Sequence, residues 1–96
     1  DILAEVCALS PRPLCVGFAA ETHDVLAYAR AKLGAKGADL IAANVVGAGA
    51  GFEVDDNTLH VVWAGGERTL GPAPKSAVAR DLIALIAEHR HEPHRP

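Results

Sequence analysis

The 96-residue sequence contains no methionine and few aromatic side chains. One tryptophan, one tyrosine and two phenylalanines make up 4% of the residues, whereas half of all residues are hydrophobic. The core must therefore be built from alanine, valine, leucine and isoleucine side chains. A chain of this length forms at most one domain of modest size.

The sequence also lacks an excess of basic residues and any long hydrophobic run. Its formal net charge is −3, which gives no general reason to bind nucleic acid or an anionic membrane, so any anion site must be local. The apolar runs are far shorter than the roughly 20 residues that span a bilayer. No basic leader with an apolar segment precedes the body. We therefore expect a cytoplasmic protein with no nucleic-acid or membrane partner.

Cysteine is scarce as well, since Cys7 and Cys15 are the only two. Both lie in apolar contexts without the spacing of a metal site, which favours buried reduced thiols over a disulfide. The sequence begins with Asp1 directly inside an apolar helical pattern, so we expect a fragment of a longer protein.

The hydrophobic pattern of the first half predicts a strand–helix–strand unit. Residues 14–19 form an apolar run without alternation, which predicts a strand buried on both faces. An amphipathic helix follows over 24–36, ended by Gly37, and a second buried strand over 39–44. The short links make this a βαβ unit, preceded by a helix over 1–9.

The second half predicts a β-hairpin and a terminal helix. Gly65-Gly66 is a hairpin turn signal between two strand patterns, and the last periodic segment is wide enough to cover a sheet face. The expected pieces are a loop at 45–51, an extended piece at 52–54, a turn at 55–57, strands at 58–63 and 67–70, a linker at 71–74 and a helix at 76–90. We expect an α/β domain over residues 1–90, a partial Rossmann-like three-layer α/β/α sheet.

Residues 91–96 are predicted to be a disordered tail. His89, His91 and His94 belong to a Pro- and Arg-containing end that is typical of a solvated segment. They could hold a metal only if ordered, and no strand or helix fixes a partner for them.

The exit of the first strand is the first candidate site, because ligands bind beyond the carboxyl ends of strands in open α/β sheets. Phe18 could stack on a base or wall a pocket, or it could be a core residue. Lys32 and Lys36 lie four apart on the predicted helix, so they share a face. Their ammonium groups could hold a pyrophosphate or triphosphate, or form a solvated basic edge.

Other features are less specific. Glu21 and Asp24 could hold magnesium or a ribose hydroxyl, or they could simply complement the helix dipole. Asn44 ends the second strand and could face a ligand or tie down the next loop. The glycines of 47–51 give a weak phosphate-loop pattern that opens no helix. No nucleophile motif or carboxylate dyad is present, so the sequence does not contain a complete active site.

Several of these residues recur, in order and spacing, in one known family. The matching segments are 16–22, 28–32 with Lys36, 38–44, Gly51-Phe52, Asp56-Asn57 and Lys75. To about Glu88 the chain resembles the C-terminal half of bacterial phosphopantothenoylcysteine synthetase (phosphopantothenate–cysteine ligase). That enzyme is the ligase domain of the bifunctional Dfp flavoprotein of coenzyme A biosynthesis.

The resemblance implies a CTP- and Mg²⁺-dependent ligation, in which 4′-phosphopantothenate forms an acyl-cytidylate that cysteine then converts to an amide. It implies a homodimer, and FMN only in a separate decarboxylase domain. It implies no catalytic or metal-binding residue in this chain. The nucleotide contacts of the family map onto Asp1, Ile2, Leu3, Phe18, Lys32 and Lys36.

The chain also departs from the family pattern. Asn44 is followed by Val45, where the family commonly has aspartate. The upstream half of the ligase, with its glycine-rich nucleotide segment and lysine-rich flap, is missing, so the chain would hold one wall of a site and not catalyse ligation alone. The alternative is a small α/β interaction or dimerisation module whose hairpin, carrying Trp63, pairs across subunits.

Overall fold

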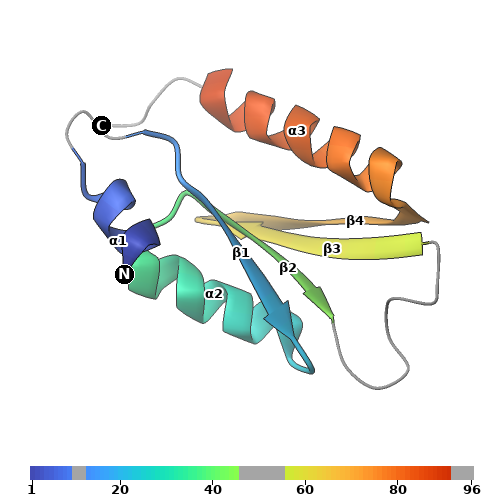
Figure 1. The fold of residues 1–96 in the computed structure, drawn as a ribbon, viewed down its shortest axis with the longest axis horizontal. Coiled ribbons are helices and arrows are strands. Elements are labelled where there is room, and N and C mark those ends of the chain that lie inside the picture. The colour runs from blue at the N-terminus through green and yellow to red at the C-terminus, as the bar shows by residue number, and fades with distance from the viewer. Residues whose placement is uncertain (10–12, 46–55, 92–96) are drawn as a thin grey trace.

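Four strands form one mixed sheet with helices on both faces. The computed structural model describes residues 1–9, 13–45 and 56–91, with only the backbone of residues 56 and 91. The elements are α1 (Ile2–Cys7), β1 (Val16–Glu21), α2 (Val25–Lys36), β2 (Leu40–Val45), β3 (Asp56–Trp63), β4 (Gly66–Pro74) and α3 (Lys75–His91). The strand order is β1-β2-β3-β4. α1 and α2 lie on one face and α3 on the other, which confirms the three-layer α/β/α fold (Figure 1).

β2 is the buried centre of the sheet, as its apolar run predicts. It pairs in parallel with β1 and antiparallel with β3. Leu40 and Ala42 join the core that packs against α3, whereas Ile41 and Ala43 join the core that packs against α2. A strand covered on both faces needs apolar side chains at its buried positions, and residues 40–43 of β2 supply them.

β1 does not match the prediction of a strand buried on both faces. It lies at the edge of the described sheet, and its side chains alternate between buried and accessible positions. Gly17 and Ala19 are buried toward α2, but Phe18 is 68% exposed. The apolar run misled the prediction because α3 packs over the inner strands and leaves this end of β1 open.

α2 begins and ends at two residues in left-handed backbone conformations. Asp24 has φ 52° and makes no capping bond, since its carboxylate lies 2.9 Å from His23 Nδ1. Gly37 has φ 69° and donates its backbone N–H to the Leu33 carbonyl at 3.1 Å, which confirms the predicted glycine cap. Between them Val25 and Ala29, one turn apart, are buried against the sheet.

The hairpin is longer than the sequence predicts. β3 begins at residue 56, so the predicted turn is wrong at 56–57, and β4 includes the predicted linker 71–74. Asn57 pairs with Ala73, beyond a register shift between Asn57 and Leu59. Two prolines fit into β4 because an edge strand leaves amide positions that need no ladder partner.

α3 covers the second face through Val78, Leu82 and Leu85, which recur at helical spacing and are buried. The helix includes His89, whose ring packs edge-on against Trp63 with the ring centroids 4.7 Å apart, so the prediction of a solvated His89 is wrong. No helix in the described ranges has the length and apolar character needed to cross a membrane.

Some predictions fall outside the described residues. These are His94, most of the 45–51 loop and the extended piece at 52–54. Cys7 and Cys15 are described and buried, and both carry thiols, as expected.

Candidate functional site

α1 positions Asp1 beside the end of α2. The Asp1 carboxylate caps α1, because Oδ1 accepts the backbone N–H groups of Leu3 at 3.0 Å and Ala4 at 3.4 Å. Its other oxygen forms an ion pair with Lys36 Nζ. The N-terminal segment and Lys36, two parts of the predicted nucleotide site, are therefore in direct contact.

Gly17 sets the distance between α1 and the sheet. A Cβ at this position would lie 2.7 Å from Leu3 Cδ2 and 2.8 Å from Ile41 Cδ1, closer than side chains approach one another. The backbone of β1 therefore passes directly under Leu3, as the glycine in the strand predicts. This contact places α1 next to the start of β1, beside the end of α2.

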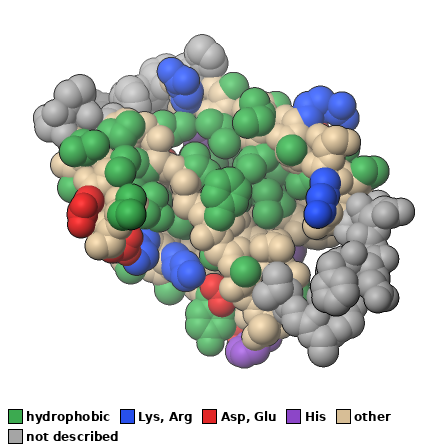
Figure 2. Space-filling model, viewed as in Figure 1, with side chains coloured by type: hydrophobic (Ala, Val, Ile, Leu, Met, Phe, Trp, Pro, Cys, Tyr) green, Lys and Arg blue, Asp and Glu red, His purple; other side chains and the backbone are tan. Residues whose placement is uncertain are grey.

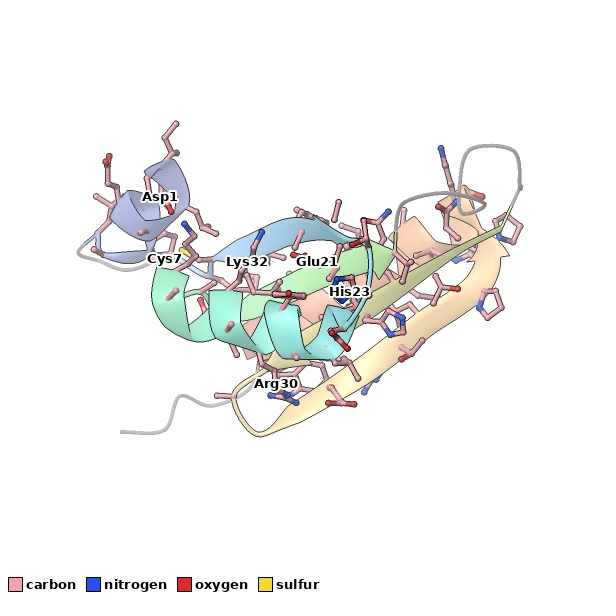
Figure 3. The ribbon with its side chains drawn as sticks, turned by 90° about the horizontal axis from the view of Figure 1, so that it is seen from below. Asp1, Cys7, Glu21, His23, Arg30 and Lys32 are labelled. Atoms are coloured by element: carbon pink, nitrogen blue, oxygen red, sulfur yellow. The ribbon has the colours of Figure 1, made fainter. Side chains whose placement is uncertain are left out.

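Lys32 extends from α2 toward the exit of β1. Its Nζ lies 3.6 Å from Glu21 Oε2, with the Glu21 side chain 16% exposed and the Lys32 side chain 45% exposed. Figure 3 shows Lys32 and Glu21 above α2 and Arg30 on its other side. Arg30 instead reaches the hairpin, where it contacts the Gly66 carbonyl at 3.1 Å and the Glu67 carboxylate at 2.9 Å.

The two lysines are thus held by different carboxylates at opposite ends of the surface that α2 forms with β1 and α1. Glu21 holds Lys32 at the strand exit, and Asp1 holds Lys36 beside α1. Both pairs lie partly open to solvent, and the Glu21 side chain is the most buried of the four partners. Ion pairs that are open to solvent contribute only about 0–1 kcal/mol to stability. A polyphosphate could therefore replace both carboxylates as the partner of the lysines at little cost to the fold.

Phe18 points to the other face of the sheet. Its neighbours Gly17 and Ala19 are buried on the α2 side, so the ring projects toward α3, where it lines a hollow of about 250 Å³. The alternative of a core phenylalanine is wrong, because the side chain is largely exposed. Since β1 is an edge strand, a ligand that contacts both the ring and the lysines must pass over that edge.

The surface shows these two regions separately. Figure 2 shows hydrophobic side chains gathered between α3 and β1, and basic side chains beside acidic ones near α1 and α2. The sequence predicted one continuous site at the strand exit. The structure instead gives a charged surface on one side of β1 and an apolar hollow on the other.

The described acidic residues do not form a magnesium site. Glu21 pairs with Lys32, and Asp24 pairs with His23. No group of three or more potential metal-ligating side chains occurs within residues 1–9, 13–45 and 56–91. The described part of the chain therefore does not fit a resident Mg²⁺ ion.

Sequence reasoning missed most polar residues of the hollow. Asn44 was a candidate because it ends β2, and it lines the hollow. Asn57, Thr58 and Lys75 also line it, but the sequence placed them in a turn, a strand and the approach to a helix. The one sequence signal for Asn57 and Lys75 was that both recur in the family pattern, and no sequence signal pointed to Thr58.

Comparisons with known proteins agree on one family. Residues 1–89 match the family described as "DNA/pantothenate metabolism flavoprotein C-terminal domain". Coenzyme A biosynthesis bifunctional protein CoaBC of Vibrio cholerae is 49% identical over 90 residues, 92% of this chain and 23% of that protein. The protein of the same name from Escherichia coli strain K12 is 42% identical over 97 residues, 99% of this chain and 24% of that protein.

A solved structure is similar to the chain over nearly its whole length and belongs to the same kind of protein as the sequence relatives. The crystal structure of the C-terminal domain of coenzyme A biosynthesis bifunctional protein CoaBC has a TM-score of 0.69 and 26% identity, covering 96% of this chain and 43% of that one. The chain spans about a quarter of the length of the curated relatives.

Proposed function

The chain belongs to the DNA/pantothenate metabolism flavoprotein C-terminal domain family, and we propose that it forms one nucleotide-binding wall of a CTP-dependent phosphopantothenate–cysteine ligase. It is homologous to the C-terminal domain of the CoaBC proteins of coenzyme A biosynthesis. The specific reaction is inferred from the resemblance to the ligase and from the surface at the exit of β1.

The proposed reaction has two steps. The carboxylate of 4′-phosphopantothenate attacks the α-phosphorus of CTP, and the bond to the β-phosphate oxygen breaks, releasing pyrophosphate. The amine of cysteine then attacks the acyl carbon, loses its proton and displaces CMP. Negative charge accumulates on the pyrophosphate in the first step, so cations fixed near the β- and γ-phosphates stabilise that step most.

The observation that supports this role most strongly is the placement of Lys32 and Lys36. Each amine is held by a carboxylate, Glu21 or Asp1, on the accessible surface formed by α1, α2 and the exit of β1. A lysine that is paired with a carboxylate at an accessible surface can exchange that partner for a phosphate oxygen. The Phe18 ring, across the edge of β1, is available to stack on a base.

Asp1, Ile2 and Leu3 complete the proposed nucleotide site. The Asp1 carboxylate holds Lys36 in the absence of the triphosphate, which would replace it, and the Leu3 side chain packs over Gly17. Ile2 is 80% exposed, so it could cover part of a bound nucleoside. The chain supplies binding groups in this proposal, and the catalytic groups belong to the rest of the ligase.

No step is assigned to a metal in this chain, because Glu21 and Asp24, the acidic residues considered for magnesium, pair with Lys32 and His23. Magnesium in the proposed reaction would accompany the triphosphate. FMN would serve a separate decarboxylase domain. The proposal keeps the cytoplasm as the location of the enzyme.

The alternative of an interaction module loses part of its support. The Trp63 ring packs against the protein's own core and against His89, and Arg30 binds the Trp63 carbonyl at 3.4 Å. These contacts occupy the side chain that was expected to meet a partner. The proposal retains a homodimer, which is supported by the accessible residues of β4 at the edge of the described sheet.

Titration of CTP and of ATP into the protein tests the proposal. We expect binding that prefers CTP and weakens about 100-fold in the double variant Lys32→Ala/Lys36→Ala, because two charge-assisted contacts to phosphate are lost. Isothermal titration calorimetry measures both affinities, and a melting curve of each variant confirms that it is folded.

The matched control is Arg80→Ala/Arg90→Ala, which removes the same charge from α3. This control should bind CTP as the unsubstituted protein does. Absence of CTP binding, or an equal loss in both double variants, would contradict the proposal.

A further inference from the structure

The hollow between β1 and α3 has polar groups concentrated at one end. Its walls include the exposed Phe18 ring and the apolar side chains Leu59, Val78 and Leu82. The polar lining comes from Asn44, Asn57, Thr58 and Lys75, which lie at the end of β2, the start of β3 and the start of α3. A concave apolar wall with a few convergent polar groups is the usual form of a small-molecule site.

Two consecutive polar residues of β3, Asn57 and Thr58, belong to this lining, although successive side chains of a regular strand point to opposite faces. A β-bulge in β4 lies opposite them, because between the pairs Asn57–Ala73 and Leu59–Leu70 one residue of β3 faces two residues of β4. Bulges distort the ladder locally and are frequent beside functional sites. Gly71, within the bulge, has φ 88°, and a side chain there would collide with the Asn57 carbonyl oxygen.

The polar groups of the hollow are short of partners. The Asn57 Nδ2 atom is buried and has no hydrogen-bond acceptor among residues 1–9, 13–45 and 56–91. Leaving such a donor unpaired costs about 1–3 kcal/mol, so it is typically retained where a ligand or water satisfies it. Lys75 forms no ion pair with the acidic side chains of the described ranges.

These donors define the ligand by its chemistry. Lys75 is the charged side chain among the described residues of the lining, and it stands at the positive end of α3. The Asn57 amide adds an N–H donor, while Phe18 and the aliphatic wall offer contact to carbon. We propose that this hollow is a second binding site, which takes a small carboxylate or phosphate ester with an apolar body, its anion on Lys75 and Asn57.

The site is separate from the proposed nucleotide surface. Lys32 and Lys36 belong to α2, and Lys75 to α3 on the opposite face of the sheet (Figure 1). Phe18 alone is shared, because it stands on the edge strand between them. The inference therefore does not depend on CTP binding. Its ligand could be the acid component of a ligation or a regulatory anion of the same chemistry.

The test uses 4-methylpentanoate and its uncharged analogue 4-methylpentanamide as probes, with binding to the protein followed by saturation-transfer NMR. We expect the carboxylate to bind with a dissociation constant on the order of 1 mM and about tenfold more tightly than the amide. Lys75→Gln should abolish that tenfold difference. Arg80→Gln, which removes a charge from the same helix without touching the hollow, should preserve it.

A second variant, Phe18→Ala, removes an exposed wall and should weaken both probes without disturbing the core. Equal affinity for the two probes, equal losses in the Lys75 and Arg80 variants, or no signal up to the solubility limit would overturn the proposal.

Two competition arms identify the source of the ligand. Excess CTP should weaken probe binding no more than Phe18→Ala does, because the two sites share only that ring, and complete displacement of the probe by CTP would show that no separate site exists. Displacement by 4′-phosphopantothenate assigns the hollow to the acid component, and its failure to displace the probe assigns the hollow to another anion; both support the site. Lys32→Ala/Lys36→Ala should lose CTP binding and still bind the probe. Unchanged CTP binding in this variant would contradict the nucleotide site alone, and loss of probe binding would contradict the separate site alone.

Discussion

At the scale of single residues, two glycines make opposite contributions to stability. Gly17 in β1 has side chains on both sides of the place where a Cβ would stand, whereas Gly34 in α2 has nothing within 4 Å of that place. Gly34 is an exposed residue within a helix. Glycine loses more conformational freedom on folding than alanine does, which lowers stability. At Gly17 a side chain would clash and lower stability further, whereas at Gly34 no such clash opposes replacement by alanine.

The substitution Gly17→Ala should lower the free energy of unfolding by about 1–3 kcal/mol, because Leu3 or Ile41 must move. The same substitution at Gly34 should raise it by about 0.5–1 kcal/mol. Urea unfolding measures both. Equal effects at the two positions would show that Leu3 does not pack over Gly17 in solution.

Phe18 and Asn57 show what a sequence cannot specify at this scale. Phe18 follows an apolar run, which favours a buried ring, and its exposure depends on how far α3 extends over the sheet. Asn57 sits in a polar cluster that is typical of a turn, and its burial depends on a bulge set by the partner strand. Both outcomes arise from long-range packing, which local periodicity does not encode.

At the scale of elements, α3 is held to the sheet by a narrow stripe of residues. Leu85 is 1% exposed and belongs to the core formed with Leu40, Ala42 and Val61. Ile83, two residues earlier on the same helix, is 65% exposed. The two positions provide a test of which face of α3 is buried.

Leu85→Ala should reduce the free energy of unfolding by about 2–5 kcal/mol, because it leaves a cavity between α3 and the sheet. Ile83→Ala should change it by less than about 0.5 kcal/mol. Chemical denaturation followed by circular dichroism measures both. A larger effect at Ile83 would mean that α3 lies on the sheet through a different face.

The elements themselves were largely predictable. β2 is apolar at every buried position, and α2 has an apolar stripe and a glycine cap, so local pattern was sufficient to place them. The end of the hairpin was not predictable in this way, because Gly71, Pro72 and Pro74 are typical of a linker. They form strand only because β4 lies at the edge, where prolines are tolerated.

At the scale of the whole molecule, the sheet separates two surfaces of different chemistry. The α2 side carries lysines held by carboxylates, and the α3 side carries an apolar hollow lined at one end by the Asn57 amide and Lys75. The sequence pattern proposed Phe18, Lys32 and Lys36 as nucleotide contacts, but it could not assign them to faces of the sheet. The structure makes that assignment, because buried and accessible side chains alternate along β1 and Phe18 lies on the face opposite Gly17 and Ala19.

The central claim is that a cytidine triphosphate takes the place of two carboxylates along α2, Glu21 at the exit of β1 and Asp1 beside the end of α2. The most direct measurement is a crystal structure of the protein with CTP bound. We predict triphosphate oxygens about 2.7–2.9 Å from the Nζ atoms of Lys32 and Lys36, with Glu21 and Asp1 no longer paired to them. A bound nucleotide with both ion pairs intact would contradict the account.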